Sequence, residues 1–261
     1  MSRVVCLLAL LAVASAQERP PGKGVNFYSL EKEAALGAQL AAEVRKVNPP
    51  LESGAVTAYI GQIGRRLAAQ LPPGGVSFTF AAITGPAENH EPIALPGGYI
   101  FVPSSLILAA QGEAEFAGML AHAVAHVAER HGTRLATRGE LANLASLPLI
   151  YMGGWTGSTA LPLGFVNVQR QLELEADRLA VRLMAGAGWD PAALARYIER
   201  VQPAGQPAMT SPLPARDLRV AALNEAIGAL PAASYEVGEG LGAIQEEVRR
   251  LVPQPARPAL K

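Results

Sequence analysis

The sequence of 261 residues contains a single cysteine, Cys6. One thiol can form neither an internal disulfide nor a cysteine-rich metal site, so both are excluded within this chain. Aromatic residues are also scarce, at 5%, and charged residues make up only 17%, compared with roughly 25% in an average soluble protein. Lysine plus arginine and aspartate plus glutamate both number 22, so the net charge is zero. Because no basic field is available to hold nucleic acid, we expect no nucleic-acid partner.

Long apolar runs are missing as well. The N-terminal run Val4–Ala14 has about half of the ~20 residues needed to cross a bilayer. It follows Arg3 and ends in the small residues Ala14-Ser15-Ala16. This pattern is typical of a secretory signal peptide over 1–16, cleaved after Ala16, and a permanent anchor is the alternative interpretation. We therefore expect a periplasmic or secreted protein whose mature chain has no thiol.

The stretch 141–168 carries no charged residue, but prolines and glycines interrupt it too often for a spanning helix. One interpretation is that it packs over the core. The other is a flap that gates substrate or makes peripheral membrane contact through 141–168.

Alanine, leucine, 26 glycines and 21 prolines dominate the remainder and favour a compact helical domain with punctuated loops. Apolar periodicity and cap residues predict seven helices, at 29–47, 53–71, 104–110, 113–138, 168–187, 191–201 and 214–230. Two β-rich runs, 76–83 and 98–102, are expected to pair in a small sheet. The predicted organisation is a linker over 17–25, one α+β domain over 26–235, and a C-terminal helix with a proline-rich tail over 236–261.

Two histidines on the strongest predicted helix could bind a metal ion. His122 and His126 are four residues apart, so both imidazoles project from one face of a helix, as two zinc ligands do. A pair at this spacing can also be ordinary packing. The run Glu173-Leu-Glu-Ala-Asp177 lies on a second apolar-patterned helix, where one carboxylate could complete the ligand set and another could orient an imidazole. The alternative for these acids is a solvated helix face.

Four motifs occur in order along the chain. They are Ala94-Leu-Pro-Gly-Gly-Tyr-Ile-Phe-Val102, Leu120-Ala-His-Ala-Val-Ala-His126 with Arg130-His131-Gly132, Arg170-Gln-Leu-Glu-Leu-Glu-Ala-Asp177, and Ala187-Gly-Trp-Asp-Pro191. In this order they resemble the HtpX/BepA-like zinc metallopeptidases, a gluzincin family that includes the CAAX prenyl proteases. The similarity covers about 26–230.

The resemblance implies a metal centre and its chemistry. His122, His126 and Glu173 would bind one zinc ion, Asp177 would assist catalysis by supporting a ligand imidazole, and Glu175 would have no contact with the metal. The family hydrolyses peptide bonds in protein quality control, so unfolded or misfolded envelope proteins would be the partners.

The resemblance also implies where substrate binds. The fold would be a mostly helical gluzincin-type domain with a small sheet whose edge strand lines the cleft. Gly97–Val102 would be that edge strand, and Gly97, Gly98, Tyr99 and Ile100 would hold the substrate backbone by β-augmentation.

The sequence departs from the family pattern at two positions. Ala123 stands where the family has the catalytic glutamate of His-Glu-x-x-His, and an alanine cannot take a proton from zinc-bound water. Ser211 stands where many relatives have a histidine that reaches the metal. Glu91 or Glu129 could replace the missing base. His131 does not match the three-histidine metzincin pattern and is expected at a helix end.

Three hypotheses follow from these departures. The chain is a zinc endopeptidase of the cell envelope with impaired catalysis, or an inactive zinc-binding pseudopeptidase that serves as a chaperone or scaffold for unfolded envelope proteins. In the third hypothesis the metal itself has been lost and the domain is purely structural.

Overall fold

The computed structural model describes residues 25–85, 90–141, 163–209, 211–236 and 238–252. Within these ranges the chain is mostly helical with one small mixed sheet, which confirms the expected α+β class. None of the described helices combines the length and apolar character needed to span a membrane. The predicted signal peptide, most of the linker, most of the uncharged stretch and the proline-rich tail lie outside the described residues.

The first two helices begin where serine caps were expected. α1 (Leu30–Val47) starts after Ser29, whose hydroxyl accepts a hydrogen bond from the backbone N–H of Lys32. α2 (Gly54–Ala68) starts in the same way after Ser53. A capping side chain satisfies one of the backbone donors that a helix leaves unpaired at its start.

The sheet has three strands in the order β1-β3-β2. β1 (Thr79–Ile83) pairs parallel with β3 (Tyr99–Pro103), and β2 (Ile93–Ala94) pairs antiparallel with the other side of β3. The expectation that the motif around Tyr99 forms an edge strand is therefore wrong. The strand β3 lies at the centre of the sheet, and the two-residue strand β2 takes the edge.

The sheet separates two apolar layers. Phe101 faces a cluster with residues of α1, whereas Ile100 and Val102 face the main core of α2 and α4, as alternation along a strand requires.

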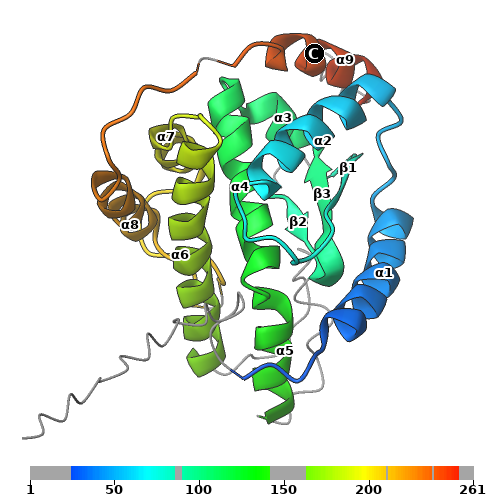
Figure 1. Cartoon of the computed structure of the whole chain (residues 1–261), viewed down its shortest axis with the longest axis vertical. Coiled ribbons are helices and arrows are strands. Elements are labelled where there is room, and N and C mark those ends of the chain that lie inside the picture. Colours follow the sequence, from blue (N-terminus) through cyan, green and yellow to red (C-terminus); the bar gives the residue numbers. More distant parts are fainter. Residues whose placement is uncertain (1–24, 86–89, 142–162, 210, 237, 253–261) are drawn as a thin grey trace, which may run out of the picture.

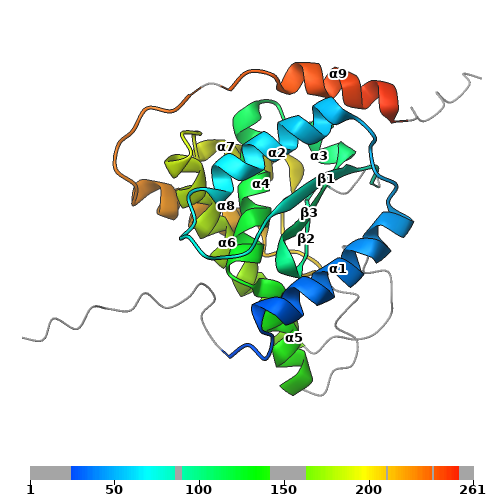
Figure 2. The same cartoon turned by 45° about the vertical axis from the view of Figure 1, so that its right-hand side comes forward.

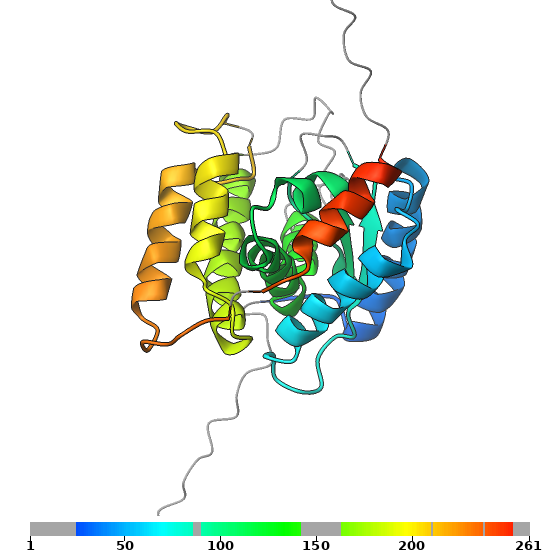
Figure 3. The same ribbon diagram turned by 90° about the horizontal axis from the view of Figure 1, so that it is seen from above.

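α4 (Glu113–Ala128) is buried over nearly its whole length and packs along α6 (Leu163–Gly186) (Figure 1). Seen from above, α6, α7 (Ala192–Val201) and α8 (Arg216–Gly228) lie on one side of α4, and the sheet with α1 and α2 lies on the other (Figure 3). α3 (Ser104–Ala109) and α9 (Leu241–Leu251) pack together at one end of this arrangement.

The single helix predicted over 113–138 is wrong, because the helix breaks in its middle. α4 ends at Ala128, and a separate helix, α5 (His131–Leu141), starts three residues later. Arg130 between them has a φ of 55°, in the left-handed region that non-glycine residues rarely adopt. Its guanidinium donates to the buried carboxylate of Glu33 on α1. The helix α1 lies beside the junction of α4 and α5 (Figure 2). A contact with a distant helix, and not a local glycine or proline, thus sets the break.

Candidate metal centre

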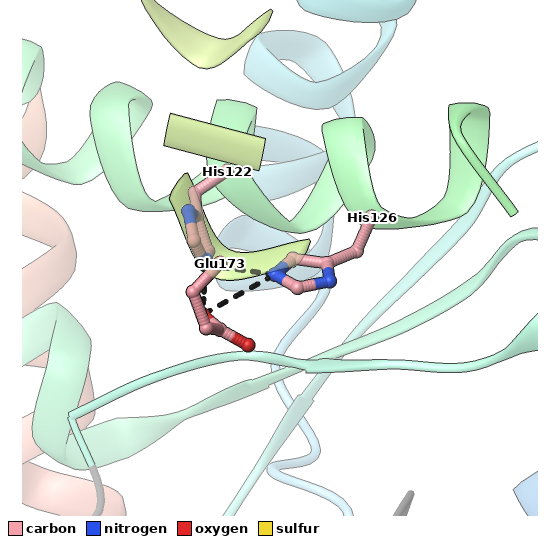
Figure 4. Close-up of side chains that lie close together, drawn as sticks. All are labelled: His122, His126 and Glu173. Atoms are coloured by element: carbon pink, nitrogen blue, oxygen red, sulfur yellow. Dashed lines mark hydrogen bonds and ion pairs between the residues drawn. The ribbon is translucent and has the colours of Figure 1, made fainter. Parts of the chain in front are cut away.

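The three predicted ligands come together at the crossing of α4 and α6. The Nε2 atoms of His122 and His126 are 3.0 Å apart, and Glu173 Oε2 lies 3.2 Å from the first and 3.5 Å from the second. All three donor atoms lie within 4.8 Å of one another. Figure 4 shows the two rings turned toward the same carboxylate. The one-turn spacing on α4 sets the distance between the rings, and α6 brings the acid against them.

The donor set suits a zinc ion. Two imidazole nitrogens and one carboxylate are the ligands of many catalytic zinc sites, which keep a fourth position for water. Oε2 of Glu173 is buried and has no hydrogen-bond partner among the described residues. Burial by itself raises the pKa of this carboxyl, but the adjacent His126 and His122 outweigh burial and hold the pKa well below its usual range. An ionised, unsatisfied carboxylate facing two imidazole nitrogens fits a cation at this position.

His122 is supported by two buried, charged residues. Asp177 Oδ1 lies 2.8 Å from His122 Nδ1, and Arg219 Nε and Nη2 each donate to the Asp177 carboxylate at 2.9 Å. Burial by itself raises the pKa of Asp177, but the adjacent Arg219 and His122 together have the larger effect and lower this pKa to about 2. Burial lowers the pKa of His122, whereas Asp177 and Glu173 raise it, to about 10. We call Asp177 and Arg219 the buried support. Asp177 lies where the resemblance placed a supporting acid.

His126 is supported differently, by residues that the sequence analysis did not assign to the centre. Its Nδ1 lies 3.1 Å from the Nδ1 of His131, and the two rings are nearly perpendicular. The other ring nitrogen of His131 lies 3.5 Å from Glu175 Oε2, and Arg134 donates to the same oxygen at 3.2 Å. Burial is the main cause that lowers the pKa of His131, to about 4, so its ring is neutral at pH 7. Contact with His131 is the main cause that lowers the pKa of Glu175, to about 2. We call His131, Glu175 and Arg134 the half-exposed support, after the partial exposure of Glu175, since His131 and Arg134 are buried.

A cleft of about 460 Å³ opens beside the ligands. Ala123 contributes to its lining and presents only a methyl group in the position that follows His122. Apart from Glu173, the carboxylates that line the cleft are already engaged. Glu91 accepts a hydrogen bond from Arg219 at 3.0 Å, and Glu33 accepts from Arg130 at 2.8 Å.

The two candidates for a replacement base are in different places. Glu91 lines the cleft, where it pairs with Arg219 of the buried support. Glu129 is the C-cap residue that follows α4, and it is not among the residues that line the cleft. Ser211, at the second departure, also lines the cleft, and its hydroxyl accepts a hydrogen bond from the backbone of Leu213 at 3.3 Å.

An edge strand lines the cleft, as expected, but it is β2. The lining runs through residues 90–96 and does not include Gly97, Gly98, Tyr99 or Ile100. The structure offers another reason for the two glycines. Both have positive φ, of 73° and 94°. A Cβ on Gly97 would lie 2.7 Å from the Cα of Ala34, and one on Gly98 would lie 2.0 Å from the carbonyl oxygen of Ser77. Close packing of this turn against α1 and the chain before β1 therefore requires glycine.

Sequence reasoning missed Arg219, His131 and Glu175 as parts of the centre. Arg219 follows Asp177 by 42 residues, and no spacing rule links the two positions. His131 follows His126 by five residues, a separation that brings the rings together only because the helix breaks. Glu175 lies on the same helix as Glu173 and Asp177, and its alignment with His131 depends on where α5 begins.

Comparison with known proteins agrees with this geometry. The sequence model of peptidase family M48 matches residues 55–227. The beta-barrel assembly-enhancing proteases of Yersinia pestis and Escherichia coli K12 are 26% identical over 203 residues and 25% identical over 207 residues, which is 71% and 73% of this chain. The mitochondrial metalloendopeptidase OMA1 of Schizosaccharomyces pombe is 30% identical over 155 residues, or 57% of this chain. The matches cover 41%, 42% and 44% of these relatives, so this chain spans less than half of their length. The family match extends over more than half of the chain and includes the His-His-Glu cluster, and the chain belongs to peptidase family M48.

Proposed function

We propose that this protein is an envelope member of the M48 metallopeptidases that binds one zinc ion through His122, His126 and Glu173 and hydrolyses peptide bonds poorly. The observation that carries the proposal is a contrast within one turn of α4. The ligand atoms converge and both imidazoles are supported, whereas Ala123, next to His122, has no group that can move a proton. When bound, zinc lowers the pKa of a coordinated water and polarises a peptide carbonyl.

The missing base determines the size of the defect. A positioned general base contributes about 10²–10⁴-fold to the rate, or about 3–5 kcal/mol of barrier. Glu91 is held by Arg219, and Glu33 is held by Arg130 and Thr133, so neither acid is placed to take over this step. We therefore expect this site to bind zinc and polypeptide although it hydrolyses peptide bonds poorly.

The cleft suits an extended, apolar stretch of polypeptide. Among the described strands β2 pairs with β3 alone, so its other side can pair with an added strand. Apolar residues surround this edge, among them Ile93, Leu95, Ile198 and Leu213. Unfolded proteins expose such segments and folded ones do not. The names of the bacterial relatives refer to β-barrel assembly, which makes unfolded envelope proteins the partners that we propose.

Location and membrane contact are proposed from the sequence. The signal-like pattern over 1–16 supports a periplasmic or secreted protein, and the uncharged stretch 141–168 supports peripheral contact with a membrane.

A second candidate function is a holder of unfolded proteins without catalysis. It is favoured by the same contrast, since the cleft, the edge strand and the ligand supports persist while the proton-transfer group does not. The two functions share the zinc site and differ only in turnover.

The test compares wild type with Ala123→Glu, and Ala123→Gln serves as a matched control of similar size that cannot act as a base. Degradation of casein is measured beside the zinc content of each protein. We expect wild type and Ala123→Gln to remain near background and Ala123→Glu to gain roughly 10²-fold or more, because the remaining parts are in place. Robust, chelator-sensitive proteolysis by wild type would contradict the impaired-enzyme proposal, and loss of that activity in Glu91→Gln would identify the substitute base.

Absence of any gain in zinc-loaded Ala123→Glu would favour the holder. In that case, zinc-loaded wild type should bind an extended apolar peptide, measured by fluorescence anisotropy, and suppress aggregation of an unfolded protein.

A further inference from the structure

His131 touches His126 although a regular helix would keep them apart. Five residues of α-helix turn the chain by about 500°, so the two side chains would point about 140° away from each other around the axis. In this chain, however, their Nδ1 atoms are 3.1 Å apart. The contact exists because the helix is interrupted between them, where α4 ends at Ala128, Arg130 has a φ of 55° and α5 begins at His131.

The break that makes this contact is fixed from outside the helix. Arg130 adopts its strained φ of 55° with its guanidinium bonded to Glu33 and to the carbonyl of Tyr28. Glu33 is buried and also accepts a hydrogen bond from the hydroxyl of Thr133 in the first turn of α5. Residues in sparsely populated backbone conformations persist when their surroundings over-determine them, and they cluster at functional sites. We therefore treat the helix break as a part of the metal centre that is held in place by Glu33.

The proton positions along this contact are mutually consistent. A histidine that binds a metal through Nε2 carries its proton on Nδ1, and that proton needs an acceptor. The Nδ1 of His131 is the atom that faces it, at 3.1 Å, and is placed to accept that hydrogen bond. His131 then carries its own proton on Nε2, the atom that lies 3.5 Å from the Glu175 carboxylate. Arg134 fixes that carboxylate through a hydrogen bond of 3.2 Å.

We propose that His131, backed by Glu175, is a positioning residue that fixes the tautomer and ring orientation of His126 and thereby strengthens metal binding. The proposal rests on the proposed zinc site. In this proposal the His131 ring positions one ligand, His126, as Asp177 positions the other, His122, and the helix break at Arg130 serves to bring His131 into place.

The test uses two substitutions of the same residue. His131→Leu fills the buried space but cannot accept a hydrogen bond. His131→Asn places an amide oxygen near the former Nδ1, and this oxygen can accept a hydrogen bond from His126. The zinc dissociation constant is measured by competition with a chelator. The visible spectrum of the Co²⁺-substituted protein reports ligand geometry, and urea unfolding in EDTA reports stability without metal.

We expect His131→Leu to weaken zinc binding about 10–100-fold and to change the Co²⁺ spectrum, and His131→Asn to remain within a few-fold of wild type in both. Thr137→Val is the control. It alters another buried residue of α5, one whose hydroxyl accepts a hydrogen bond from the Phe27 N–H. It should lower stability and leave the zinc dissociation constant unchanged.

Two results would overturn the proposal while leaving the zinc site intact. One is unchanged zinc affinity in His131→Leu. The other is an equal loss in His131→Leu and His131→Asn that matches their loss of stability, which would assign His131 to packing. Failure of wild type to bind zinc would overturn the proposed site and this inference with it.

Discussion

The two imidazoles of one helix are supported in different ways. The buried support of His122 consists of an acid and a guanidinium with side-chain exposures of 0% and 1%. The half-exposed support of His126 passes through a buried ring to Glu175, which is 32% exposed, and then to Arg134, whose side chain is only 8% exposed. Both arrangements give Nδ1 of the ligand a partner and leave Nε2 facing Glu173. The comparison shows that ligand orientation can be achieved with or without burying a charge pair.

The energetic consequences of the two arrangements differ. A buried pair is expensive to break, because the partner left behind keeps its charge in a medium that cannot solvate it. A pair whose remaining acid is partly exposed, as Glu175 is, loses less, because water replaces the missing partner. The buried support should therefore matter for folding as well as for metal binding, and the half-exposed support mainly for metal binding.

Removal of the two arginines gives the largest expected contrast. Arg219→Met leaves the buried Asp177 without its guanidinium partner, with His122 alone beside it, and also removes a partner of Glu91. We expect a loss of about 3–5 kcal/mol in the free energy of unfolding, measured by urea titration in EDTA. The matched variant Arg134→Met should lose about 1 kcal/mol or less. Equal losses in both variants would remove the distinction between the supports.

The acids give a smaller contrast, in metal affinity. Asp177 contacts His122 directly, so Asp177→Asn should weaken zinc binding about 10–100-fold. Glu175 acts through His131 and is accessible to water, so Glu175→Gln should weaken binding only a few-fold. Chelator competition measures both dissociation constants. Wild-type affinity in Asp177→Asn would show that Asp177 has no role in positioning the ligand.

Salt should produce the smallest effect and sharpen the comparison further. At 1 M NaCl the screening length falls to about 3 Å, and exposed charges are screened far more than buried ones. The stability lost in Arg134→Met should therefore shrink toward zero at high salt, and the loss in Arg219→Met should persist. Urea titrations at low and high salt test this, and the opposite pattern would mean that the burial of the two pairs has been misjudged.

Local patterns made the helices and the ligands predictable. Serine caps and apolar spacing identified α1 and α2, and the separation of His122 and His126 placed their side chains on one face. The same rules failed at Arg130, because apolar periodicity continues to Val127 and the break itself, at Glu129 and Arg130, contains no glycine or proline. The residue that stabilises the break, Glu33, precedes it by 97 positions.

The supports and the edge strand show the same limit. The strand β2 has two residues, too few for any alternation to appear. The longer β-rich motif beside it, Gly97–Val102, therefore predicts the edge strand instead. Nothing in the local sequence of α8 distinguishes Arg219 from other helical arginines. Only the packing of α8 against α6 brings the Arg219 guanidinium to Asp177. Contacts between residues far apart in sequence, which no local pattern encodes, complete the metal centre.

Metal analysis of the purified protein tests the central claim most directly, namely that His122, His126 and Glu173 form one zinc site. After dialysis against buffer with trace zinc, wild type should contain one zinc ion per chain, and His126→Ala should contain none. Circular dichroism of the variant would verify that it remains folded. Zinc-free wild type, or stoichiometric zinc in folded His126→Ala, would contradict the assignment.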